Sequence, residues 1–187
     1  MNDSQIITAC KKQDRSAQKV LYERYAPKMM AVCLRYCKDY ETARDLLHDG
    51  FLQVFSQIGS YAGKGSFEGW LRKIFVNVAL EDYRQKQREI TFHNEFGQNE
   101  AEFAEDGNDD GDMLDIGDVP REEIMKIIQE LPDGYRTVFN LVIFEDLPHK
   151  EIASRLGISE GSSRSQFFRA KEILQKKVQS IIKREYL

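Results

Sequence analysis

Residues 147–171, LPHKEIASRLGISEGSSRSQFFRAK, predict two helices joined by a tight turn. Pro148 suits the first position of a helix, where its missing N–H costs nothing. Gly157 is expected to end that helix, because glycine adopts the left-handed conformation of a C-terminal cap at little cost. Between them, an apolar stripe recurs at helical spacing: Ile152, Ala153 and Leu156. The pattern is that of a helix-turn-helix.

The second helix of this pair has an apolar side and a polar side. Ser159 is suited to cap it, with Glu160 in the positively polarised first turn. Phe167, Ala170 and Leu174 are expected to pack inward. Other faces carry Arg164, Ser165, Phe168, Arg169 and Lys171. Basic and hydroxyl side chains near the start of such a helix suit a DNA major groove, although a plain helical hairpin with a solvated charged face shares this spacing.

The composition favours an all-α protein. The 187 residues leave room for one domain or two small ones, and no run alternates in the manner of a strand. Cys10, Cys33 and Cys37 have no clustered partners, so we expect core thiols and neither a zinc site nor another cofactor. No stretch is apolar enough for membrane insertion, and the N-terminus lacks a signal-peptide core. We therefore expect a cytoplasmic protein.

Charge is distributed unevenly along the chain, although the net charge is only −4. Residues 1–88 hold fifteen basic and ten acidic side chains, and residues 121–187 hold twelve and ten. Residues 89–120 hold eleven acidic side chains and no Lys or Arg. No helical or strand period is present between about 91 and 119, and such a composition buries too little apolar surface to fold. We predict two small helical domains, 1–90 and 121–187, joined by a flexible acidic linker, 91–120.

Four helices are expected in the first domain. A short one covers residues 3–12, and Asp14 can cap a second that Pro27 must kink or interrupt. Its apolar positions are Val20, Leu21, Tyr25, Met29, Val32, Cys33 and Tyr36. Asp39 can cap a third from Tyr40 to Ile58, followed by the glycine-rich loop 59–65 (GSYAGKG). Ser66 can cap a fourth over residues 67–89, which becomes basic in its second half.

The third and fourth helices each have an apolar stripe. In the third helix the stripe is Ala43, Leu46, Leu47, Phe51, Val54 and Phe55, and the opposite face shows Asp45, His48, Asp49 and Gln53. A single histidine on such a face is usually a solvated residue. In the fourth helix the apolar positions include Phe67, Trp70, Leu71, Ile74 and Val78.

Two further helices precede the helix-turn-helix. One begins at Arg121 with Ile124, Ile127, Ile128 and Leu131 on one side. The sequence LPDG then breaks the chain, and an apolar helix is expected from Tyr135 to Phe144.

Two separated stretches resemble one family. Residues 131–174 resemble region 4 of bacterial RNA polymerase sigma factors of the extracytoplasmic function (ECF) group. Residues 45–55 (DLLHDGFLQVF) and 65–88 (GSFEGWLRKIFVNVALEDYRQKQR) resemble region 2 of the same group. The resemblance implies a non-catalytic protein that binds core RNA polymerase and directs promoter-specific transcription initiation. It implies recognition of −35 and −10 elements and help in opening the DNA.

The resemblance also implies partners. Asp45, His48 and Asp49 would contact the β′ clamp coiled coil, and Gln53 belongs to the same motif. His48 stands where the family usually has glutamine. Region 4 would contact the β flap, and an anti-sigma factor that covers both domains is expected. The protein itself would act as a monomer.

The implied promoter contacts fall in both regions. The segment that opens the −10 element matches Tyr61, Lys64, Ser66, Phe67 and Trp70, and its recognition helix matches Asn77, Asp82 and Arg84. For Phe67 and Trp70 a place in the core is the alternative. The positions that enter the −35 major groove match Arg164, Ser165, Phe168 and Arg169, whereas Lys150 and Lys171 would meet phosphates. Ser163 replaces a usual valine, and Gln166 replaces a usual arginine.

Two other classes of protein fit parts of the sequence. A helix-turn-helix regulator would bind a duplex operator without polymerase, but the sequence contains no dimer seam or sensing domain. A helical interaction protein would show no promoter selectivity. Catalysis has little support, because the three histidines (His48, His93 and His149) are scattered over a helix, the linker and a turn.

Overall fold

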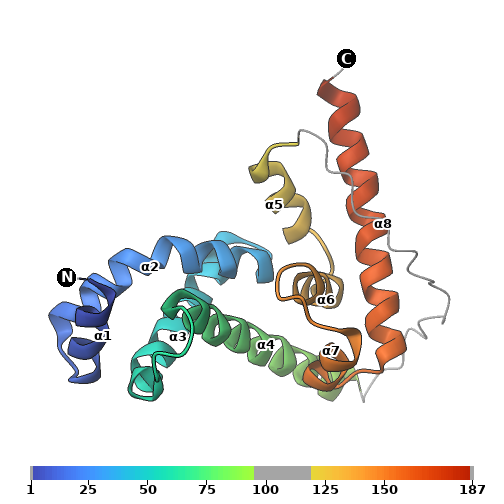
Figure 1. Cartoon of the computed structure of the whole chain (residues 1–187). Helices are drawn as coiled ribbons and strands as arrows, with labels where there is room; N and C mark the ends of the chain where they lie inside the picture. The colour runs from blue at the N-terminus through green and yellow to red at the C-terminus, as the bar shows by residue number, and fades with distance from the viewer. Residues whose placement is uncertain (1, 95–118, 186–187) are drawn as a thin grey trace. The chain divides into compact units, whose positions relative to one another are not determined.

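A computed structural model describes residues 2–94 and 119–185 of the chain. Within these ranges every regular element is a helix, so the all-α prediction is confirmed (Figure 1). The chain divides into two units, Met1–Glu81 and Asp82–Leu187, and the division falls inside the fourth helix, α4 (Phe67–Asn94). None of the described helices has the length and apolar character needed to cross a membrane. Most of the predicted linker (91–120), namely residues 95–118, falls outside the described residues.

The first unit contains α1 (Asp3–Lys11), α2 (Arg15–Tyr36), α3 (Tyr40–Gln57), the short 3₁₀ helix η1 (Ile58–Ser60) and the start of α4. The caps expected from the sequence are present. Asp14, Asp39 and Ser66 each accept hydrogen bonds from backbone N–H groups in the first turn of the following helix, at 2.8–3.1 Å. These bonds satisfy donors that have no partner inside the helix.

The core of the first unit forms where α2 packs against α1 and α3. Its buried side chains include Ile6, Leu21, Met29, Leu46, Leu47, Val54, Leu71 and Ile74. All three cysteines are buried free thiols, as expected of core residues. Phe75 of α4 is wholly buried, although it was not among the predicted core residues. A Cβ atom on Gly50 would lie 2.1 Å from its ring, so the missing side chain of Gly50 lets Phe75 pack against α3.

Several details of the first unit differ from the prediction. Of the two effects predicted for Pro27, a kink or an interruption, the interruption does not occur, because α2 continues for nine residues beyond it. Pro27 lies on the exposed side of the helix. Tyr25 and Met29, one on each side of it in the sequence, are buried in the core and anchor the helix before and after the proline. Val20, Phe55 and Val78 are only partly buried. Helix α4 also extends to Asn94, so the first four residues of the predicted linker, 91–94, are helical.

The second unit contains α5 (Arg121–Gln129), α6 (Asp133–Ile143), α7 (His149–Leu156) and α8 (Glu160–Glu185), and α8 packs against the other three (Figure 1). The core consists of Ile127, Ile128, Leu131, Val138, Phe139, Leu141, Ile152, Leu156, Phe167, Ala170, Leu174 and Val178. Gly157 ends α7 at a φ of 70°, as predicted. Helix α6 begins two residues earlier than predicted, and Pro148 is the residue before α7 and not its first residue.

A buried arginine connects α5 to α6. Arg136 is only 4% exposed, and its guanidinium donates hydrogen bonds to the carbonyl oxygens of Gln129 and Leu131, each at 2.8 Å. It also pairs with Asp133. Because these acceptors lie at the end of α5 and the start of α6, Arg136 closes the turn on which the helix-turn-helix packs. A buried charge satisfied by several partners is retained at low cost.

Candidate functional site

The outer face of α3 carries the four residues matched to the polymerase-binding motif. Asp45, His48, Asp49 and Gln53 are all exposed, whereas the apolar stripe of the same helix is buried. Gln53 accepts a hydrogen bond from the amide of Gln57 one turn on, at 2.9 Å. Asp45, Asp49 and Gln53 recur every four residues and His48 lies three residues after Asp45, so the four side chains follow one side of the helix. The result is an acidic, hydrogen-bonding face on α3.

An exposed leucine interrupts this polar face. Leu52 is 56% exposed and lies one turn beyond His48 and Asp49. On α2, Tyr22 is 43% exposed and its ring lies 4.6 Å from that of Phe51. Sequence reasoning missed both residues. For Leu52 the sequence did contain a sign of exposure, because this apolar residue lies off the buried stripe of α3.

A cluster of aromatic rings joins the loop between η1 and α4 to the first turn of α4. Tyr61 meets Phe67 at 5.1 Å and Trp70 at 5.3 Å, and Phe67 stacks on Trp70 at 5.5 Å. Phe67 is 6% exposed, so it belongs to the core, while Tyr61 and Trp70 are half-buried. Lys64 and Ser66 are exposed beside them. The loop has positive φ angles at Gly63 (74°) and Gly65 (77°), which only glycine adopts without strain.

Two of the three matched residues on α4 share a face. Asn77 and Arg84 are seven residues apart and therefore lie two turns apart on the same side of the helix. Asp82 lies on a different side, where it pairs with Lys86 at 2.6 Å. All three side chains are exposed. A DNA strand that contacts both Asn77 and Arg84 would therefore have Asp82 only at the edge of the contact.

The helix-turn-helix forms as its spacing predicted. The Ser159 hydroxyl caps α8 by accepting a hydrogen bond from the Ser162 N–H at 2.9 Å. Phe167, Ala170 and Leu174 are buried. The remaining sides of α8 show exposed Arg164 and Arg169 and half-buried Ser165, Phe168 and Lys171, with Lys150 exposed on α7. The ammonium of Lys171 lies 5.5 Å from the centre of the Phe167 ring.

Both matched arginines of α8 are held by acidic neighbours. Arg164 pairs with Glu160 at 2.6 Å and Arg169 pairs with Glu172 at 3.0 Å. These pairs are exposed, and exposed ion pairs contribute only about 0–1 kcal/mol. The guanidinium groups can therefore be redirected to a base edge at small cost.

The two departures from the family pattern lie inside the second unit. Ser163 is fully buried, and its hydroxyl oxygen lies 2.9 Å from Nδ1 of His149 in a hydrogen bond between α8 and α7. Gln166 is 8% exposed. Polar side chains thus occupy buried positions of the helix-turn-helix, and the hydrogen bond of His149 compensates for the apolar packing absent at Ser163.

Two family models match the chain. Sigma-70 region 2 matches residues 21–89, and sigma-70 region 4 matches residues 121–174. Together the two matched segments cover more than half of the chain. The chain belongs to the sigma-70 family. As a sigma factor of the ECF group, it directs promoter-specific initiation of transcription.

Relatives of this sigma factor align with it over nearly their whole length. The RNA polymerase sigma-H factor of Pseudomonas aeruginosa is 25% identical over 186 residues, which cover 97% of this chain and 96% of that protein. The ECF RNA polymerase sigma-E factor of Escherichia coli (strain K12) is 27% identical over 189 residues, or 98% of each chain.

Two solved structures are similar at lower identity. One is the sigma factor RpoE in complex with the anti-sigma factor NepR from Bartonella quintana, with a TM-score of 0.49, 19% identity and coverage of 86% of this chain and 96% of that one. The other is CnrH in complex with the cytosolic domain of CnrY, with a TM-score of 0.47, 15% identity and coverage of 95% and 97%.

Proposed function

We propose that this sigma factor docks on core RNA polymerase through the outer face of α3 and recognises promoters through two separate surfaces. Residues 1–90 would bind polymerase and the −10 element, residues 91–120 would form an acidic linker, and residues 121–187 would bind the −35 element. The β′ clamp coiled coil would contact Asp45, His48 and Asp49, with Gln53 at the edge. The β flap would contact the C-terminal region.

The observation that carries this proposal is the division of α8 into a buried and an outward side. The outward side holds Arg164, Ser165, Phe168 and Arg169, the residues suited to a −35 major groove. Arginine pairs with guanine edges, and the Phe168 ring suits a thymine methyl group. Lys150 on α7 and Lys171 on α8 would contact phosphates, which position the helix without selecting a sequence.

The −10 surface would combine the aromatic loop with one side of α4. The opened strand would be received by Tyr61, Lys64, Ser66, Phe67 and Trp70. Because Phe67 is buried, it would support the other rings from beneath the surface. Asn77 and Arg84 would contact the element from one face of α4, with Asp82 at its margin. Extruding a base costs a few kcal/mol of stacking, and ring contacts in the loop would recover part of it.

Neither surface needs to bind DNA tightly alone. Residues 1–88 and residues 121–187 each carry only a small excess of basic side chains, which limits the number of phosphate contacts that each can make. When polymerase holds both, binding at one element raises the effective concentration at the other. Two weak sites then act as one selective unit.

The remaining properties follow from the same proposal. The sigma factor would act as a non-catalytic monomer in the cytoplasm, because polymerase supplies the chemistry. An anti-sigma factor would inhibit it by covering the exposed face of α3 and the outward side of α8 together.

One experiment tests the proposal directly. The purified protein is mixed with core polymerase and a promoter library, and the transcribed sequences are determined. We expect enrichment of two short elements separated by a fixed spacer. Failure to bind core polymerase, together with tight binding of duplex DNA by a dimer of the isolated protein, would instead identify a helix-turn-helix regulator.

A further inference from the structure

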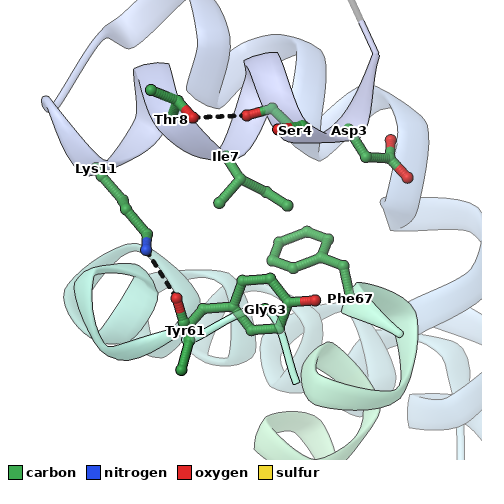
Figure 2. Close-up of a pocket in the computed structure, with 9 residues that line it drawn as sticks. Asp3, Ser4, Ile7, Thr8, Lys11, Tyr61, Gly63 and Phe67 are labelled. Carbon is green, nitrogen blue, oxygen red and sulfur yellow. Dashed lines mark hydrogen bonds between the residues drawn. The ribbon is translucent and has the colours of Figure 1, made fainter. Parts of the chain in front are cut away.

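A pocket of about 560 Å³ lies between α1 and the loop that leads into α4 (Figure 2). One wall comes from α1 and comprises Asp3, Ser4, Ile7, Thr8 and Lys11. The opposite wall comprises Tyr61, Ala62, Gly63 and Phe67. The volume is within the range of pockets that hold small organic groups. Both walls belong to the first unit.

The inner surface of the pocket is apolar and partly aromatic. Ile7 points from α1 toward the rings of Tyr61 and Phe67 (Figure 2). Those rings are held by one another and by Trp70, at 5.1–5.5 Å. A fixed aromatic surface suits a nucleobase, because every base has a π-face that stacks on such rings.

The rim of the pocket is polar. The Thr8 hydroxyl donates to the carbonyl of Ser4 at 2.8 Å, and its oxygen remains able to accept a hydrogen bond. The Asp3 carboxylate accepts hydrogen bonds from Arg24 at 2.6 Å and Tyr25 at 2.8 Å, which fix its position. Hydroxyl groups and a carboxylate at the rim can meet the donors and acceptors of a base edge.

Lys11 connects α1 to the loop. Its ammonium donates a hydrogen bond to the carbonyl oxygen of Tyr61 at 2.7 Å (Figure 2). The Tyr61 hydroxyl in turn donates to the carbonyl of Gly65 at 3.0 Å. Since Gly63 and Gly65 leave the loop backbone free to adopt many conformations, Lys11 is well placed to select one of them.

We propose that α1 supplies the second wall of a pocket for one unpaired promoter base, and that Lys11 is a positioning residue that keeps the loop ready to receive it. The proposal rests on the proposed −10 function of the loop. It extends that function to α1, where the resemblance to sigma factors assigned no role.

The test uses the full chain assembled with core polymerase and a promoter taken from the library selection. Fork-junction DNA carries 2-aminopurine at successive positions of a single-stranded −10 element, and stacking of that base quenches its fluorescence. Three variants receive the same side chain: Thr8→Met fills the pocket, Lys11→Met removes the hydrogen bond to the loop, and Lys12→Met changes a neighbouring exposed lysine that does not line the pocket.

We expect wild type and Lys12→Met to quench 2-aminopurine at one position. Thr8→Met and Lys11→Met should lose that quenching and bind the fork DNA about tenfold more weakly. Their affinities for core polymerase and for a −35 duplex should not change. Lys11→Arg should restore quenching, because arginine can also donate to the Tyr61 carbonyl.

Unchanged quenching in both pocket variants, or an equal loss in Lys12→Met, would overturn the inference while leaving the proposed function intact. Failure of the proposed function would appear earlier, as wild-type protein that does not bind core polymerase or select a promoter, and the inference would fail with it.

Discussion

Nδ1 of His149 lies 2.9 Å from the hydroxyl oxygen of Ser163, and this hydrogen bond joins the first helix of the helix-turn-helix to the second. Ser163→Ala removes the bond from a buried position. We expect the free energy of unfolding to fall by about 1 kcal/mol, measured by urea denaturation with hydrogen exchange of α7 amides. Ser154→Ala, at an exposed position of α7, is the control and should change stability by less than about 0.5 kcal/mol. Equal effects of the two variants would exclude a stabilising role for the bond.

The outer face of α3 provides a test of polymerase docking. Asp49→Lys reverses a charge on this face without touching the buried stripe. We expect at least a tenfold loss of affinity for core polymerase, about 1.4 kcal/mol, with an unchanged circular dichroism spectrum. Glu23→Lys makes the same charge change on α2, at an exposed position that pairs with exposed Lys19, and should bind normally. If both variants bind core polymerase alike, the face is wrongly assigned.

Arg164 and Lys150 should affect promoter choice differently. Arg164→Ala should relax selectivity at one −35 position by about 1–3 kcal/mol, because it removes a base contact. Lys150→Ala should weaken binding to all sequences evenly and reduce its salt dependence. Selection from a randomised −35 library by each holoenzyme distinguishes the two patterns. Unaltered selectivity with Arg164→Ala would mean that another side of α8 faces the DNA.

Gly50 is expected to be intolerant of substitution. In Gly50→Ala the new Cβ would meet the ring of Phe75 at 2.1 Å, so the buried ring must shift or α3 and α4 must separate. We expect a loss of about 1–3 kcal/mol in the free energy of unfolding. Gly59→Ala is the matched control, because a Cβ there meets no atom within 4 Å. Comparable melting temperatures for the two variants would contradict this packing.

Stability should decline at alkaline pH through Tyr25. Burial, followed by the hydrogen bond to Asp3, raises the pKa of Tyr25 from 10.0 to about 12. The unfolded chain therefore loses this proton first, and the stabilisation is complete below pH 10 and lost between about pH 10 and 12. Tyr25→Phe should flatten the stability curve in that window, as measured by denaturant midpoints.

Tyr40→Phe is the control for this pH dependence, since Tyr40 is 58% exposed on α3. Its curve should match that of the wild type. Cys33, whose pKa burial raises to about 12, contributes to the alkaline loss in every variant. The informative quantity is thus the difference between the curves. Superimposable curves for Tyr25→Phe and wild type would refute the assignment.

Helix boundaries were predictable wherever short-range chemistry sets them. Asp14, Asp39, Ser66 and Gly157 act on residues within one turn of themselves, so their roles can be inferred from a few neighbouring letters. Pro27 shows the limit of this reasoning. Its local effect favours a break, but apolar contacts along the rest of α2 keep the helix continuous.

The candidate surfaces were predictable as faces, because helical periodicity separates buried from exposed positions. The exposure of Asp49 and Arg164 and the burial of Phe167 follow from spacing alone. Their binding roles stay predictions. Leu52 was missed because its apolar type suggests a core position, although its place off the buried stripe of α3 indicates the exposure that the structure shows.

The sequence by itself determined the helical class of this protein, its family and the outward sides of its helices, because caps, periodicity and motif order are written in neighbouring residues. Only the tertiary structure decided which distant residues meet. Phe75 fits against Gly50, Ser163 bonds to His149, and Lys11 reaches the loop at Tyr61. Such pairs depend on how helices pack in three dimensions, and their separation along the chain contains no trace of that packing.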